Sequence, residues 1–181
     1  MADLTGQPDG GDREPDPDAD PYAVARAIVL RRLAAAPRSR AELAATLTRK
    51  NVPSEVGQAV LDRFEELGLV DDHAYAEMVV RTRHAERGLA RRGLASELAR
   101  RGVPRDVAED ALAPVDRDAE QQAAARLVAK RLPGLAGQPR PVAERRLAGM
   151  LARKGYPPGL IRTAVTQALD ERAADERGGP D

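Results

Sequence analysis

The chain contains no cysteine and no tryptophan, and its only aromatic residues are three tyrosines and one phenylalanine among 181 residues. Without cysteine it has neither a disulfide framework nor a thiolate metal site, which suits a reducing compartment. No run of about 18 apolar residues occurs, so the sequence predicts no membrane-spanning helix. Residues 1–20 lack an apolar core segment, which excludes a secretory signal peptide. We therefore expect a cytoplasmic protein without membrane association.

Residues that carry catalysis or cofactor binding are also scarce. His73 and His84 are the only histidines, and their separation is not the i, i+3 or i, i+4 spacing of a helical metal site. No glycine-rich loop precedes Lys-Ser or Lys-Thr, and no Ser, His and Asp stand in a hydrolase-like arrangement. Asp71 and Asp72 could be metal ligands or an acid/base pair, but acids at a helix start are better explained as a cap. We therefore expect no enzyme activity, no cofactor and no metal ion.

Charge is present in large amounts and is unevenly distributed. The formal net charge is zero, yet residues 1–20 carry seven acids and one Arg, and residues 170–181 carry five acids and two Arg. The stretch between them therefore has a net charge of +9, which offsets −6 and −3. A basic body favours a polyanion or an acidic protein surface as partner. The first segment, rich in Gly, Pro and acids, reads as disordered; it is either a solubilising tail or an autoinhibitory mimic of an acidic partner.

One pattern occurs three times: a helix stopped by Gly or Asn, followed by a helix begun by Pro. The central copy runs from Leu94 to Leu112 and turns at Gly102. The matching positions of the first and third copies are Leu43, Leu47, Asn51, Val52, Pro53, Val56, Val60 and Leu61, and Leu147, Leu151, Gly155, Tyr156, Pro157, Leu160, Ala164 and Val165. The hinges Asn51, Gly102 and Gly155 lie 51 and 53 residues apart (102 − 51 and 155 − 102). A period near 50 residues indicates a repeat protein.

We therefore predict an all-α fold of three tandem three-helix repeats that form an elongated, curved body. The predicted boundaries are 21–70, 71–115 and 116–170, with disordered acidic tails at 1–20 and 171–181. Each unit has about 45 residues, which is small for a free-standing core, so neighbouring repeats should stack. Curved helical arrays present a long surface to a protein or polymer and rarely enclose a catalytic cleft. We expect a monomer.

Local signals place some helix ends. Ser39 stands three residues before Glu42, a capping box that begins a helix. Gly88 and Gly93 are expected to frame a linker. Residues 133–141 contain three prolines and two glycines and are expected to form a rigid loop.

Basic residues fall into two groups. The first comprises pairs directly before each hinge: Arg49-Lys50, Arg100-Arg101 and Arg153-Lys154. Cations in the last turn of a helix interact favourably with its free carbonyls, by roughly 0.3–1 kcal/mol each, which explains these pairs without a partner. The second group is mostly confined to the central unit: Arg81, Arg83, Arg87, Arg91, Arg92 and Arg105. A cluster that the other units do not repeat favours a contact surface over a solvated face.

We therefore take as candidate partner- or DNA-binding residues the central arginines together with the central hinge pair: Arg81, Arg83, Arg87, Arg91, Arg92, Arg100, Arg101 and Arg105. The periodicity assigns the one aromatic nearby, Tyr75, to the core. Stacking on single-stranded bases is therefore not the evident mode. Arginine contacts to phosphate or carboxylate fit better.

Four local signatures resemble the RecX family of recombination regulators. They are Arg38-Ser39-Arg40-Ala41-Glu42-Leu43; Leu67 to Ala76 (sequence LGLVDDHAYA) followed by Arg81; Gly88 to Leu98 leading to Arg101-Gly102-Val103-Pro104; and Leu151-Ala152-Arg153-Lys154-Gly155-Tyr156. The resemblance covers about residues 22–169, and the second signature is the most specific. Asn51 stands where Gly is usual, and Tyr75 and Tyr156 stand where Phe is common; these changes are compatible with the fold.

The resemblance implies a cytoplasmic inhibitor of RecA that takes part in regulating DNA repair and homologous recombination. Such proteins lie in the helical groove of the RecA–single-stranded DNA filament. They suppress its ATP hydrolysis, strand exchange and coprotease action, and so temper the SOS response. Two other interpretations of the residues remain: a DNA-binding protein that acts without RecA, and an inert helical scaffold.

Overall fold

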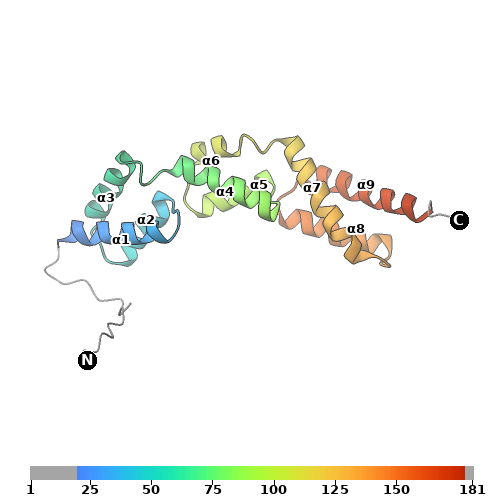
Figure 1. Cartoon of the computed structure of the whole chain (residues 1–181), viewed down its shortest axis with the longest axis horizontal. Helices are drawn as coiled ribbons and strands as arrows, with labels where there is room; N and C mark the ends of the chain where they lie inside the picture. Colours follow the sequence, from blue (N-terminus) through green and yellow to red (C-terminus); the bar gives the residue numbers. More distant parts are fainter. Residues whose placement is uncertain (1–19, 178–181) are drawn as a thin grey trace, which may run out of the picture.

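The computed structural model describes residues 20–177, and within that range the chain forms nine α-helices, one short 3-10 helix and no strand. Repeat 1 consists of α1 (Pro21–Ala35), α2 (Arg40–Arg49) and α3 (Ser54–Glu66); repeat 2 of α4 (Asp72–Arg87), α5 (Arg91–Arg100) and α6 (Arg105–Leu112); repeat 3 of α7 (Arg117–Arg131), the 3-10 helix η1 (Leu132–Leu135), α8 (Arg140–Arg153) and α9 (Pro158–Arg177). The three groups follow one another along an elongated, arched body (Figure 1). The prediction of an all-α, three-repeat fold is confirmed.

Each repeat has its own small core. Val29, Leu43 and Phe64 are buried in the core of repeat 1, and Val80 and Leu98 in that of repeat 2. The core of repeat 3 contains Val128, Leu147, Leu151 and Val165, and Ala90, which precedes α5, also packs into it. Repeat 2 therefore contributes a residue to the core of its neighbour, which ties the two repeats together.

The predicted hinges are confirmed in detail. Asn51, Gly102 and Gly155 have φ values of +56°, +71° and +90°, and Asn51 is the one non-glycine residue with positive φ in residues 20–177. Each lies in the left-handed region that ends helices. The residue after the hinge donates its N–H to a carbonyl of the preceding helix, as Val103 does to Leu98 at 3.1 Å. Three helix pairs thus turn by the same local device.

Helix starts also follow the sequence signals. The Ser39 hydroxyl accepts the Glu42 N–H, and the Glu42 carboxylate accepts the Ser39 N–H, which completes the capping box of α2. The side chains of Asp71 and Asp116 accept backbone N–H groups in the first turns of α4 and α7. The capping interpretation of Asp71 is therefore confirmed.

Three local expectations differ from the structure. Gly93 does not frame a linker, because α5 already begins at Arg91. The segment 133–141 is not only loop, because η1 places Leu135 in the core of repeat 3, where it is fully buried. Finally, α9 continues to Arg177, so the acidic segment predicted as disordered from residue 171 begins as helix. The predicted tail at 1–19 and residues 178–181 lie outside the described residues.

Candidate functional site

The eight candidate arginines do not form one surface. Arg83 and Arg101 both point to Glu97, which is only 8% exposed. The Glu97 carboxylate accepts from Arg83 Nε at 3.2 Å and from a terminal nitrogen of Arg101 at 2.8 Å. Both arginines are therefore engaged within repeat 2, where they neutralise a buried carboxylate between α4 and α5. A partner contact of Arg83 and Arg101 stays a prediction.

The environment of Glu97 acts on its pKa in two directions. Burial raises the pKa, because a carboxylate loses hydration there, but the hydrogen bonds and charges of Arg101 and Arg83 outweigh that effect. The net pKa is lowered, so Glu97 is a carboxylate at neutral pH. Burial acts against the charge of Arg101 as well, yet Glu97 and Tyr75 raise its pKa on balance.

Arg101 also reaches into repeat 1. It donates to the Tyr75 hydroxyl at 2.7 Å, and this hydroxyl in turn donates to Glu42 at 3.0 Å. The carbonyl oxygen of Arg101 accepts the Ser39 hydroxyl at 2.6 Å. Burial raises the pKa of Tyr75, and Glu42 adds to that rise against the opposing effect of Arg101. The joint between repeats 1 and 2 is thus a network of charged and hydroxyl side chains.

In the joint between repeats 2 and 3, backbone carbonyls accept the hydrogen bonds. The Ala90 N–H donates to the Lys154 carbonyl at 3.0 Å, and the Tyr156 hydroxyl donates to the Gly88 carbonyl at 3.1 Å. Burial raises the pKa of Tyr156 to about 12, with a smaller contribution from the charge of Glu120. The Lys154 ammonium donates to the Arg87 carbonyl. The hinge of each later repeat therefore docks on the start of the second helix in the repeat before it.

Two further candidates are held in part by neighbours. The guanidinium of Arg91 donates to the Leu112 carbonyl, and its backbone N–H donates to Glu120 at 2.9 Å. Arg105 forms an ion pair with Glu109 at 2.8 Å, with the Arg105 side chain 92% exposed. The hydrogen bond to Glu109 raises the pKa of Arg105, which stays fully protonated. Such an exposed pair contributes little to stability.

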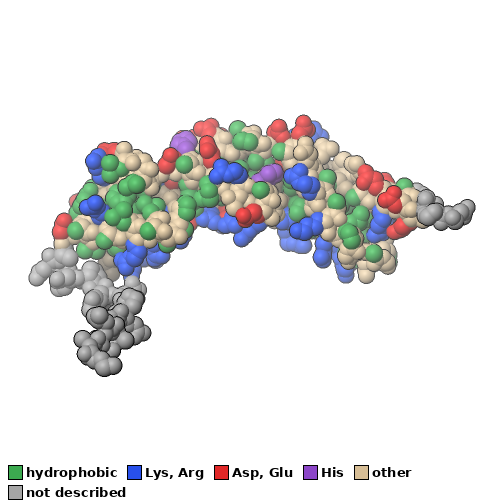
Figure 2. All heavy atoms as spheres, viewed as in Figure 1, with side chains coloured by type: hydrophobic (Ala, Val, Ile, Leu, Met, Phe, Trp, Pro, Cys, Tyr) green, Lys and Arg blue, Asp and Glu red, His purple; other side chains and the backbone are tan. Residues whose placement is uncertain are grey.

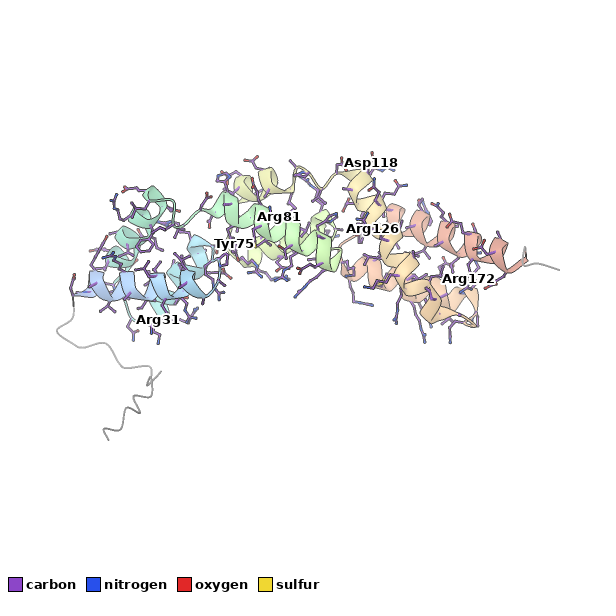
Figure 3. All side chains as sticks on the ribbon, in the orientation of Figure 1. Arg31, Tyr75, Arg81, Asp118, Arg126 and Arg172 are labelled. Carbon is purple, nitrogen blue, oxygen red and sulfur yellow. The ribbon has the colours of Figure 1, made fainter. Side chains whose placement is uncertain are left out.

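The remaining candidates, Arg81, Arg87, Arg92 and Arg100, are exposed. Within residues 20–177 no hydrogen bond or ion pair engages their side chains. Arg81 is marked on α4 in Figure 3. These four stay available for a partner.

Sequence reasoning interpreted Arg49 and Arg153 as helix-end cations only, and it did not consider Arg145 and Arg146. Arg49, Arg100 and Arg153 are each the last residue of their helix, and all three are exposed. Moreover, the i, i+8 pair Arg92 and Arg100 recurs 53 residues later as Arg145 and Arg153 (145 − 92 and 153 − 100). That recurrence marks Arg145 and Arg153 as equivalents of the candidates Arg92 and Arg100. We call the set of exposed arginines in the second helices the basic edge; its members are Arg49, Arg92, Arg100, Arg145, Arg146 and Arg153.

Charge is segregated on the body as a whole. Figure 2 shows Lys and Arg side chains gathered along the lower, hollowed edge, and acidic side chains gathered along the upper edge. Figure 3 places Arg31 on the lower side of α1 and Asp118 at the top of α7, in keeping with that division. One long side of the molecule is therefore suited to an anionic partner.

Comparison with known proteins decides the family. Models of the first, second and third three-helix domains of RecX match residues 25–64, 71–112 and 118–165. The chain is 47% identical over 174 residues to the regulatory protein RecX of Thermobifida fusca, covering 96% of this chain and 92% of that protein. The chain belongs to the RecX family. A second RecX protein, from Streptomyces coelicolor, is 46% identical over 160 residues, which cover 88% of this chain and 85% of the relative.

Solved structures agree with the RecX fold. The crystal structure of RecX from Lactobacillus salivarius superimposes with a TM-score of 0.73 at 22% identity, covering 83% of this chain and 97% of that one. A second crystal structure, of a regulatory protein RecX, gives a TM-score of 0.70 at 23% identity, with coverage of 80% and 71%. At that level of identity the likeness establishes the fold.

Two other kinds of feature can be assessed within residues 20–177. No group of three or more His, Cys, Asp or Glu residues is placed to hold a metal ion. No helix in the described range is both long and apolar enough to cross a membrane.

Proposed function

We propose that this protein binds RecA–single-stranded DNA filaments and inhibits RecA's ATP hydrolysis, strand exchange and coprotease action. It would thereby moderate DNA repair and the SOS response without being an enzyme itself, acting as a monomer in the cytoplasm. The supporting observation is twofold: the second helix of every repeat carries exposed arginines of the basic edge, and the Lys and Arg side chains of the elongated body gather along one long edge (Figure 2). Membership of a family of regulatory proteins points the same way.

The spacing of the arginines suits a repeating partner. Arg92 and Arg100 lie about two turns apart on one helix, roughly 12 Å at 1.5 Å per residue, and Arg145 and Arg153 repeat that spacing on α8. Guanidinium groups bind phosphate and carboxylate oxygens by paired hydrogen bonds. A filament of identical subunits on nucleic acid offers such oxygens at regular intervals.

The alternative is direct DNA binding without RecA. Phosphate-dominated binding loses affinity steeply as salt rises, whereas a protein surface adds contacts that salt screens less. We therefore propose to compare binding to bare single-stranded DNA and to RecA-coated DNA at one salt concentration near 0.15 M. Tighter binding to the coated DNA supports the filament function, tighter binding to bare DNA supports the alternative, and binding to neither contradicts both.

A further inference from the structure

Repeats 1 and 2 bury equivalent core positions but differ at the ion network around Glu97, where Arg101 also corresponds to Lys50 (101 − 51 = 50). Ala25, Val29 and Leu43 are buried in repeat 1, and their counterparts 51 residues later, Ala76, Val80 and Leu94, are buried in repeat 2. The same shift relates Arg32 to Arg83 (83 − 32 = 51) and Thr46 to Glu97 (97 − 46 = 51). Repeat 1 therefore has an arginine, Arg32, at the position of Arg83. At the position of Glu97, whose carboxylate neutralises Arg83, repeat 1 has the uncharged Thr46.

A cavity of about 260 Å³ lies at this place in repeat 1. Its lining comprises Arg32, Arg38, Glu42, Leu43, Ala45, Thr46 and Arg49. Three arginines, of which Arg32 and Arg49 are exposed, therefore line this space together with a single glutamate. That carboxylate is committed elsewhere, because Glu42 accepts from Ser39 and Tyr75 at the joint between the repeats.

The polar groups of this cavity are incompletely matched. The Nε of Arg38 is buried and has no hydrogen-bond partner within residues 20–177, and Arg38 approaches Glu42 only to 4.0 Å. No hydrogen bond or ion pair engages the Arg32 side chain in the same range. Arg49 donates to the Thr46 hydroxyl at 2.9 Å, which is a neutral acceptor. Within residues 20–177 no carboxylate neutralises the charges of Arg32 and Arg49, so this pocket offers positive charge to an arriving anion.

We propose that this cavity binds a carboxylate side chain from an acidic peptide segment, in the place that the Glu97 carboxylate occupies in repeat 2. Repeat 2 supplies the precedent, because one carboxylate there joins two arginines from different helices. The inference goes beyond the proposed function and does not rest on it. The acidic segment comes either from residues 1–19 of this chain, which carry six acids, or from another protein.

The decisive variant is Thr46→Glu, which supplies the carboxylate from within repeat 1. A fluorescein-labelled hexaglutamate peptide is titrated with the full-length protein at 0.15 M ionic strength, and anisotropy is measured. We expect Thr46→Glu to weaken peptide binding about tenfold or more, the effect of losing a charge-assisted hydrogen bond. Thr48→Glu adds the same charge at an exposed site on the same helix and is expected to retain most of the affinity. Equal losses in the two variants would overturn the proposal.

Two double variants test the cavity independently, so that the proposal stays testable if Thr46→Glu does not fold. Arg32→Gln with Arg38→Gln should reduce peptide binding, whereas Arg117→Gln with Arg162→Gln changes the charge equally at exposed positions of repeat 3 and should not. Circular dichroism confirms that each variant is folded. Tripolyphosphate serves as competitor: if it displaces the peptide more strongly than unlabelled hexaglutamate does, the cavity is a phosphate site and the carboxylate assignment is wrong.

The source of the acidic segment is tested in the intact chain. One variant carries amides in place of the acids before α1, at positions Asp3, Asp9, Asp12, Glu14, Asp16 and Asp18. If these residues compete for the cavity, the neutralised protein binds hexaglutamate more tightly than the unchanged protein. Equal affinity assigns the site to an external acidic segment. If neither protein binds the peptide at all, the proposal is wrong.

Discussion

The backbones of Gly93 and Gly155 lie in direct contact at the joint between repeats 2 and 3. A methyl group added to Gly155 would stand 2.5 Å from the Gly93 nitrogen, and one added to Gly93 would stand 2.5 Å from the Lys154 carbonyl oxygen. Neither backbone atom can move aside cheaply. The repeats can approach this closely only because both positions lack a side chain.

Gly93→Ala should therefore destabilise the protein although alanine is the better helix former. We expect a loss of about 1–3 kcal/mol, the usual cost of overpacking, measured by urea unfolding. Gly159→Ala is the matched control, because Gly159 also lies in the first turn of a helix but has nothing within 4 Å of the added methyl group. That variant should be neutral or slightly stabilising. Equal stability of the two variants would contradict the close joint.

Glu97→Gln should lower stability in a pH-dependent way. The folded-state pKa of Glu97 is below its usual value of 4.5, so its charge stabilises the fold above about pH 4.5 and that contribution is lost as pH falls through the folded-state pKa. We expect a gap of about 1–2 kcal/mol between the unchanged protein and Glu97→Gln at pH 7. The gap should narrow below pH 4.5.

The control for that experiment is Glu109→Gln, which removes the exposed partner of Arg105. Surface pairs of this kind contribute little, so its unfolding curve should match that of the unchanged protein at pH 7. A stability gap for Glu97→Gln that stays constant from pH 7 to pH 3 would contradict the ion network.

Two double variants distinguish arginines that bind the filament from arginines that stabilise the fold. Each variant replaces two arginines by glutamine, so both change the net charge equally. Arg92→Gln with Arg100→Gln removes exposed arginines of the basic edge and should weaken filament binding about tenfold with an unchanged melting temperature. Arg83→Gln with Arg101→Gln removes both partners of the buried Glu97 and should lower the melting temperature. If the exposed pair affects melting and the buried pair does not, the division of the arginines is wrong.

The sequence was most informative where structure is decided locally. Gly102 and Gly155 could be recognised as hinges because a left-handed residue between two helices leaves a signature within a few positions. Ser39 and Glu42 likewise predicted a helix start, because a capping box is a pattern of four consecutive residues. Repetition of these signals was enough to predict the fold class.

The candidate site was less predictable because it depends on which helix faces meet. The i, i+4 spacing of Glu97 and Arg101 could have indicated that pair, but no local pattern indicates that Arg83 joins it, since α4 supplies Arg83 and α5 the carboxylate. Sequence reasoning placed Gly93 in a linker. The structure shows instead that a side chain at this position would clash with the Lys154 carbonyl of the next repeat. Contacts between repeats leave no local pattern.

The central claim is that the chain inhibits RecA on DNA, and RecA's single-stranded-DNA-dependent ATP hydrolysis tests it most directly. The protein is titrated into preformed filaments at less than one molecule per RecA subunit, with Arg92→Gln/Arg100→Gln as a parallel sample. The account predicts that the hydrolysis rate falls with the unchanged protein and that the variant needs a higher concentration for the same effect. A hydrolysis rate that stays constant as the unchanged protein is added would contradict the account.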